Sequence, residues 1–212
     1  MARTNRDMEL DLDTPHGPAR VYLHPAEGDP VALLVLGHGA NGQVRAPDLL
    51  KATEAANARG VSVALVEQPY KVAGRRAPAP AAQLDAAFIA VVEQLRADAP
   101  VIVGGRSMGA RVACRTSGAL GAVGVLCLAF PVHPPGRPEK SRIEQLDAVE
   151  VPVLVVQGTR DAFGMPPPAP GREIVQIEGG DHSLKSGLDT LGEAVGDWLA
   201  RVTRSPRART GA

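Results

Sequence analysis

The chain alternates between short apolar runs and longer segments in which apolar residues recur every three or four positions. The apolar runs cover residues 31–36, 61–66, 101–103, 123–130, 151–156 and 174–177. Near-continuous runs of this kind are typical of strands buried on both faces of a mostly parallel sheet. The helical pattern covers a stretch around 49–56 and residues 84–95, 107–116 and 188–202. Segments 8–12 and 19–23 flank a Pro-His-Gly-Pro turn and indicate an antiparallel hairpin at one edge. The sequence therefore predicts an α/β fold with a mostly parallel central sheet and helices on both faces.

Length and composition limit the classes of protein that fit this pattern. The chain has 212 residues, of which 44% are apolar, enough for one domain with a hydrophobic core. We place that domain at residues 1–202 and expect 203–212, which contain several arginines, to be a disordered basic tail. Basic and acidic residues number 23 each and aromatic residues make up 3%, so we expect no nucleic-acid partner.

No segment resembles a signal peptide or approaches the roughly 18 apolar residues of a membrane span. We therefore expect a cytoplasmic protein with no membrane partner. Cys114 and Cys127 lie in apolar segments, which favours two buried thiols over a disulfide, although both arrangements remain open. The sequence does not predict an oligomeric state.

A candidate nucleophile follows the run at 101–103. The segment Gly105-Arg-Ser-Met-Gly109 has the pattern G-x-S-x-G between a predicted strand and a predicted helix. In that context the serine occupies a sharp turn that exposes its hydroxyl, and the glycines permit close packing of strand and helix. The alternative, Ser107 as a helix N-cap, does not explain the paired glycines.

An acid and a base are expected beyond two later strands. Asp161 follows the run at 151–156, and His182 follows the run at 174–177. The carboxyl ends of parallel strands meet at one edge, so Ser107, Asp161 and His182 should converge there as nucleophile, acid and base. Asp181 is an alternative acid, and His133 is an alternative base because it also follows a strand.

Two backbone N–H groups are expected to stabilise the oxyanion that acyl transfer creates. One belongs to Met108, the residue after the nucleophile, and the other to Ala40, in the Gly37-His-Gly-Ala40 loop. We interpret His38 as a structural loop residue, with a catalytic role as the alternative. The chain has no zinc-binding cluster, and Ser107 and His182 with two backbone donors are sufficient for acyl transfer, so we expect no metal and no cofactor.

The sequence resembles an α/β-hydrolase-like family that includes an animal testis-expressed protein, a subunit of the nonspecific-lethal histone acetyltransferase complex, and bacterial proteins of the dienelactone-hydrolase type. The matching segments are 37–40, 69–70, 74–75, 104–109 with Arg111, 130–140, 155–161, 163–164 and 181–183. Asn41 and Ala110 depart from the family pattern. The resemblance implies the α/β-hydrolase fold and places nucleophile, acid and base at Ser107, Asp161 and His182. It implies no substrate, and because some relatives are subunits of a complex, a catalytically weak binding or scaffold protein is the alternative function.

The expected pocket is shallow. Only twenty residues separate Phe130 from Val151, too few for a separate cap domain, and the prolines of 131–138 predict a rigid loop over the site. We assign substrate binding to Asn41, Tyr70, Arg106 and His133. Arg106 favours an acidic substrate, as Arg75 and Arg76 would unless these two side chains lie on the surface. The alternative for Arg106 and Arg111 is that they brace loops through carbonyl or carboxylate contacts.

Together these residues predict a serine hydrolase of the esterase type. It would cleave a small ester or thioester, its small-molecule acyl substrate, through an acyl-enzyme. A narrower dienelactone-type activity is disfavoured, because serine stands where those enzymes usually have cysteine.

Overall fold

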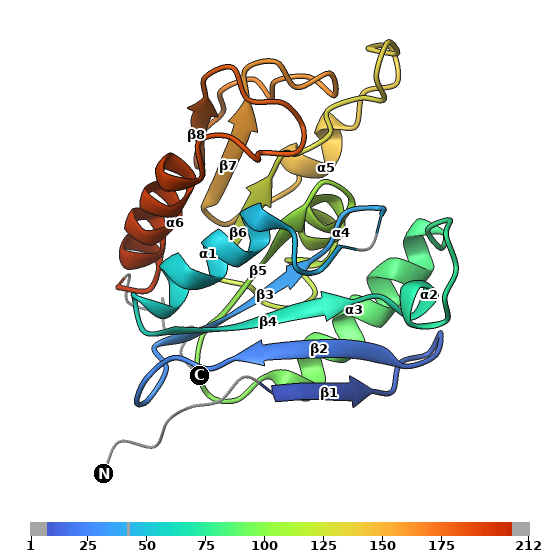
Figure 1. Ribbon diagram of the computed structural model, residues 1–212, viewed down its shortest axis with the longest axis vertical. Coiled ribbons are helices and arrows are strands. Elements are labelled where there is room, and N and C mark those ends of the chain that lie inside the picture. The colour runs from blue at the N-terminus through green and yellow to red at the C-terminus, as the bar shows by residue number, and fades with distance from the viewer. Residues whose placement is uncertain (1–7, 42, 205–212) are drawn as a thin grey trace.

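An eight-stranded sheet forms the centre of the molecule, in the order β1-β2-β4-β3-β5-β6-β7-β8 (Figure 1). The computed structural model describes residues 8–41 and 43–204. The strands are β1 (Met8–Leu12), β2 (Ala19–His24), β3 (Ala32–Gly37), β4 (Val61–Glu67), β5 (Val101–Arg106), β6 (Gly124–Leu128), β7 (Val153–Gly158) and β8 (Arg172–Ile177). From β4 to β8 all neighbouring strands are parallel, whereas β2 pairs antiparallel with both β1 and β4. The predicted sheet and edge hairpin are confirmed.

Helices cover both faces of this sheet, as predicted. They are α1 (Pro47–Asn57), α2 (Pro69–Val72), α3 (Ala81–Leu95), α4 (Met108–Thr116), α5 (Ile143–Asp147) and α6 (Leu188–Val202). On one face α1 and α6 pack together in a core that includes Leu49 and Trp198. On the other face α3, α4 and α5 bury a second core that includes Phe88 and Val112 (Figure 1). Both faces are apolar, which explains why the central strands show no alternating pattern.

Some boundaries differ from the sequence prediction. The strand predicted at 123–130 is β6, which ends at Leu128 because Ala129 adopts a positive φ of 52° that breaks the extended backbone. The short helices α2 and α5 were not predicted, since four or five residues are too few to show a helical repeat. Thr203 and Arg204 form a turn after α6, and the rest of the predicted tail lies outside the described residues.

The connection between β6 and β7 contains α5 but no further domain, so the expected absence of a cap domain is confirmed for this connection. None of the described helices is long and apolar enough to cross a membrane.

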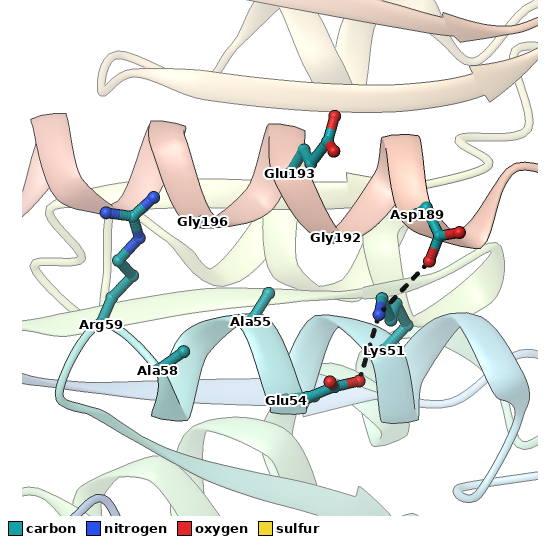
Figure 2. Close-up of a pocket in the computed structure, with 9 residues that line it drawn as sticks. All are labelled: Lys51, Glu54, Ala55, Ala58, Arg59, Asp189, Gly192, Glu193 and Gly196. Carbon is teal, nitrogen blue, oxygen red and sulfur yellow. Dashed lines mark ion pairs between the residues drawn. The ribbon is translucent and has the colours of Figure 1, made fainter.

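Two glycines bring α1 and α6 close together beside a groove of about 330 Å³ (Figure 2). A Cβ atom at Gly192 would lie 2.7 Å from Cε of Lys51, and one at Gly196 would lie 3.3 Å from Nε of Arg59. The glycines therefore leave space for the stem of Lys51 and for the guanidinium group of Arg59. This packing anchors α1, whose first turn carries a buried carboxylate that bears on the site described below.

Candidate active site

Ser107 occupies a sharp turn between β5 and α4. Its backbone has φ 53° and ψ −107°, a conformation that L residues rarely adopt and that tertiary contacts must maintain. Those contacts include a close approach of α4 to β3, because a Cβ atom at Gly109 would overlap the carbonyl group of Gly37. Gly105 faces the same crowding, since a Cβ there would lie 2.7 Å from the carbonyl carbon of Gly109. The glycines of the motif thus permit the packing that supports the turn.

The side chains of Ser107, His182 and Asp161 form one hydrogen-bonded chain. Nε2 of His182 lies 2.8 Å from Oγ of Ser107, and Nδ1 lies 2.8 Å from Oδ2 of Asp161. Asp161 follows β7 and His182 follows β8, so the structure brings the three predicted residues together at the carboxyl edge of the sheet. With Nδ1 protonated toward the carboxylate, Nε2 is free to accept the serine proton.

The loops that carry Asp161 and His182 are joined to each other. The Arg160 N–H donates to the Gly180 carbonyl at 2.9 Å, and the Thr159 N–H donates to the Ile177 carbonyl at 3.0 Å. A Cβ atom at Gly158 would overlap the same Gly180 carbonyl. Glycine at 158 therefore allows the two loops to touch through their backbones.

Further contacts hold the acid and the base in place. The carboxylate of Asp161 accepts hydrogen bonds from the Gln157 amide and from the Phe163 N–H, each at 2.8 Å. The Phe163 ring stacks on the His182 imidazole, with 4.0 Å between ring centroids and 28° between planes. Gln157 and Phe163 lie in segments that match the family, but the sequence analysis gave neither of them a role, because a buried glutamine and a loop phenylalanine carry no pattern of their own.

The alternative acid and base lie elsewhere. Asp181 is exposed and accepts from the N–H and the hydroxyl of Ser183, at 2.8 and 2.5 Å. These hydrogen bonds lower the pKa of Asp181, and its carboxylate does not contact the imidazole of its neighbour among the described contacts. His133 binds the Pro134 carbonyl through Nδ1 at 2.9 Å. The hydrogen bonds of His182 thus favour Asp161 as its partner.

The aromatic side chains of His38 and Tyr70 hold the loop after β3 in place. Nδ1 of buried His38 donates to the Gly39 carbonyl at 2.6 Å, and its Nε2 accepts the Gln68 N–H at 3.1 Å. Burial lowers the pKa of His38 to about 4, so the ring is neutral at pH 7. The Tyr70 hydroxyl donates to the Ala40 carbonyl at 2.9 Å. These contacts agree with a structural role for His38 and give Tyr70 the role of a loop brace.

Ala40 and Met108 both line the same cavity as Ser107. No described residue accepts a hydrogen bond from either backbone N–H. Both groups are therefore available to a substrate oxygen, which is the property required of oxyanion donors.

Arg106 connects the nucleophile turn to the base. Its Nε donates to Oδ2 of Asp48 at 2.8 Å, and its Nη2 donates to the His182 carbonyl at 3.0 Å. The Asp48 side chain is fully buried in the first turn of α1, and its burial raises its pKa, whereas Arg106 opposes that rise. The structure thus favours the bracing alternative for Arg106 over contact with substrate. Sequence reasoning missed Asp48, because nothing local relates it to a residue so far along the chain.

The cavity at Ser107 has a volume of about 310 Å³. It lies between α3, α4 and the loops after β3, β6 and β7, and Pro131 of the predicted proline loop forms part of its wall. None of the four residues assigned to substrate binding lines this cavity; they are Asn41, Tyr70, Arg106 and His133. Three arginines that line it, Arg111, Arg115 and Arg142, were not assigned to substrate.

Two further observations concern metals and thiols. The described residues contain no cluster of three or more His, Cys, Asp or Glu side chains able to hold a metal ion. Cys114 and Cys127 are free and buried, with their sulfur atoms 3.6 Å apart, which agrees with the favoured prediction of buried thiols.

Comparison with known proteins assigns the chain to a family. The family described as "Alpha/beta hydrolase domain" matches residues 30–205. No curated protein matches the sequence.

Among solved structures, the chain is similar to an α/β serine hydrolase without a lid from Xanthomonas campestris, with TM-score 0.78, 20% identity, and coverage of 97% of this chain and 99% of that chain. It is also similar to Est1E from Butyrivibrio proteoclasticus (TM-score 0.76, 16% identity, coverage 93% and 99%). A dienelactone hydrolase from Anabaena variabilis gives TM-score 0.72, 13% identity, and coverage of 94% and 99%. At these identities the likenesses show the fold, in agreement with the family match. The chain belongs to the α/β-hydrolase domain family.

Proposed function

We propose that this protein is a serine hydrolase that cleaves a small ester or thioester through an acyl-enzyme. The observation that carries the proposal is the continuous hydrogen bonding from Ser107 through His182 to Asp161, in which Ser107 occupies a strained turn and lines a cavity. The lidless serine hydrolase from Xanthomonas campestris, which is similar in fold, supports it.

In the proposed reaction, Oγ of Ser107 attacks the substrate carbonyl carbon while Nε2 of His182 takes the hydroxyl proton. Asp161 keeps the proton on Nδ1 and stabilises the imidazolium that forms. The N–H groups of Met108 and Ala40 bind the developing oxyanion. His182 then returns its proton to the leaving alcohol or thiol, and a water activated by His182 hydrolyses the acyl-enzyme.

The cavity volume of about 310 Å³ lies at the lower end of ligand sites, so the preferred acyl groups should be short. The absence of a cap in the β6–β7 connection leaves the substrate to be recognised by the cavity wall itself.

A fluorophosphonate probe tests the proposal directly. We expect stoichiometric labelling of Ser107 and hydrolysis of short p-nitrophenyl esters, and we expect Ser107→Ala to abolish labelling and lower kcat by up to about a millionfold. Ser186→Ala, which removes an exposed hydroxyl before α6, is the matched control and should keep both properties. A folded protein that is neither labelled nor active on any ester or thioester would refute the proposal. Stoichiometric capture of a protein partner, unaffected by Ser107→Ala, would instead support the scaffold alternative.

A further inference from the structure

Three arginine side chains line the cavity that contains Ser107. Two of them, Arg111 and Arg115, belong to α4, and positions 107, 111 and 115 are four residues apart. Residues with this spacing lie on the same face of a helix, so the arginines extend in a row from the nucleophile. Arg142 reaches the same cavity from the start of α5. The lining residues include no aspartate or glutamate, which gives this wall a positive charge.

Arg115 is neutralised within the protein. Its Nε and Nη2 donate to the two carboxylate oxygens of Asp85 at 2.8 and 2.6 Å, and its Nη1 donates to Oε1 of Gln145 at 3.1 Å. A bidentate pair of this kind satisfies the guanidinium in both charge and hydrogen bonding. Arg115 therefore supports the wall and has little capacity for a ligand.

Arg111 and Arg142 have no such partner. Nε of Arg111 donates to the neutral amide oxygen of Gln145 at 3.0 Å, and Arg142 has no side-chain hydrogen bond or ion pair with any described residue. Burial lowers the pKa of Arg111 to about 10, and repulsion by Arg142 and Arg115 acts in the same direction. Glu144 and Asp85 attract Arg111, but neither forms an ion pair with it in the described structure. Two half-buried cations thus line the cavity without an ion pair to a described carboxylate, so both guanidinium groups are available to bind an anion.

We propose that the substrate carries an anionic group, a carboxylate or a phosphate, that binds between Arg111 and Arg142 a few bonds from the scissile carbonyl. The inference rests on the proposed hydrolase function, because it assigns the charge to the molecule that Ser107 attacks. Guanidinium groups bind both kinds of anion with two parallel hydrogen bonds. A small cavity also favours a short anionic chain, since the charge must reach the arginines while the carbonyl stays at Ser107.

Matched pairs of esters test this inference. On the acyl side, mono-p-nitrophenyl adipate is compared with p-nitrophenyl 6-methylheptanoate, in which an isopropyl group replaces the carboxylate, and with the phosphonate analogue of the adipate. On the leaving-group side, 3-(4-acetoxyphenyl)propanoate is compared with its neutral amide. We expect kcat/KM to favour the anionic member of one pair by about 10- to 100-fold, the effect of one or two charge-assisted hydrogen bonds. The phosphonate ester shows whether carboxylate or phosphate is the preferred anion.

Arg142→Gln and Arg111→Gln should each lower this anionic preference at least about tenfold. Arg142→Gln removes no side-chain hydrogen bond or ion pair with a described residue and should fold normally, so it is the decisive variant. Arg137→Gln, at an exposed arginine of the same connection, is the matched control and should retain the preference. Equal or better cleavage of the neutral members in both pairs, or a preference that survives both substitutions, would overturn the inference.

A binding measurement distinguishes failure of the proposed hydrolase function from failure of the anion site. If Ser107 is not labelled and no ester is cleaved, calorimetric titration with monoethyl adipate shows whether the anion site exists without the hydrolase activity. Binding that Arg142→Gln weakens at least about tenfold would retain the anion site without the hydrolase. No binding, or equal binding by the wild type and the variant, would overturn the anion site as well.

Discussion

Replacing Arg106 with methionine should destabilise the protein in a manner that depends on pH. The substitution keeps an apolar stem but removes the only ion-pair partner that Asp48 has among the described residues, and the Asp48 side chain is fully buried. Burial already raises the pKa of Asp48, and without Arg106 that pKa should rise further. At pH values above the wild-type pKa of Asp48, the variant would then hold a proton that the wild type releases.

The size of the effect follows from this proton. If Asp48 becomes neutral, the electrostatic cost at pH 7 cannot exceed the cost of protonating an ordinary aspartate, about 1.36 × (7 − 3.9), or about 4 kcal/mol. Breaking a buried ion pair typically costs about 3–5 kcal/mol, so we expect a loss of about 3–4 kcal/mol at pH 7. The loss should grow as pH rises through the wild-type pKa of Asp48 and shrink as pH falls below that pKa, where both proteins carry the neutral acid.

The assay is urea unfolding followed by the fluorescence of Trp198, the single tryptophan, which is 2% exposed. Measurements at pH 4.5, 6 and 8 on the wild type, Arg106→Met, Asp48→Asn and the double variant form a double-mutant cycle. Adding Asp48→Asn to Arg106→Met should restore much of the stability at pH 8. A destabilisation that is constant with pH, or a double variant no more stable than Arg106→Met, would refute the reasoning.

Three other predictions follow from buried groups near the site. Acidification from pH 7 to pH 4 should remove about 3 kcal/mol of stability through His38, because its folded-state pKa of about 4 lies below its unfolded-state pKa of about 6.5. The midpoint of urea unfolding should therefore depend less on pH in His38→Gln than in the wild type. An equal pH dependence of the two midpoints would contradict this prediction. Gly109→Ala should cost about 3 kcal/mol or more through backbone overlap, whereas Gly118→Ala, in open space, should be nearly neutral in thermal unfolding. Burial and the neighbouring Cys114 raise the pKa of Cys127, so both thiols should react with Ellman's reagent only as fast as the protein unfolds; rapid reaction of the native protein would exclude this.

The candidate catalytic residues at the ends of strands were the part of the site that could be predicted best from the sequence. Ser107, Asp161 and His182 each follow an apolar run, and parallel strands bring such positions to one edge whatever their separation along the chain. The sheet and its helices could also be predicted, because strands that are buried on both faces consist of near-continuous apolar runs in the sequence.

Contacts between side chains from distant segments could not be predicted. Arg106 was noticed because it adjoins the nucleophile, but its orientation depends on Asp48, 58 residues earlier, and that pair has no local signature. Tyr70 was assigned to substrate binding from its position alone, whereas in the structure its hydroxyl donates a hydrogen bond to the Ala40 carbonyl. Arg142 was missed because its place in the cavity depends on how the proline-rich connection folds back over α4.

The backbone contact between the loops after β7 and β8 separates two properties of this site. Gly158 and Gly180 lock the acid and the base into a common module, built at one end of the sheet. The arginines that would select a substrate belong to a different part of the scaffold, α4 and the start of α5. Substitutions in α4 and at the start of α5 could therefore change the substrate specificity, while the residues that transfer the proton stay unchanged.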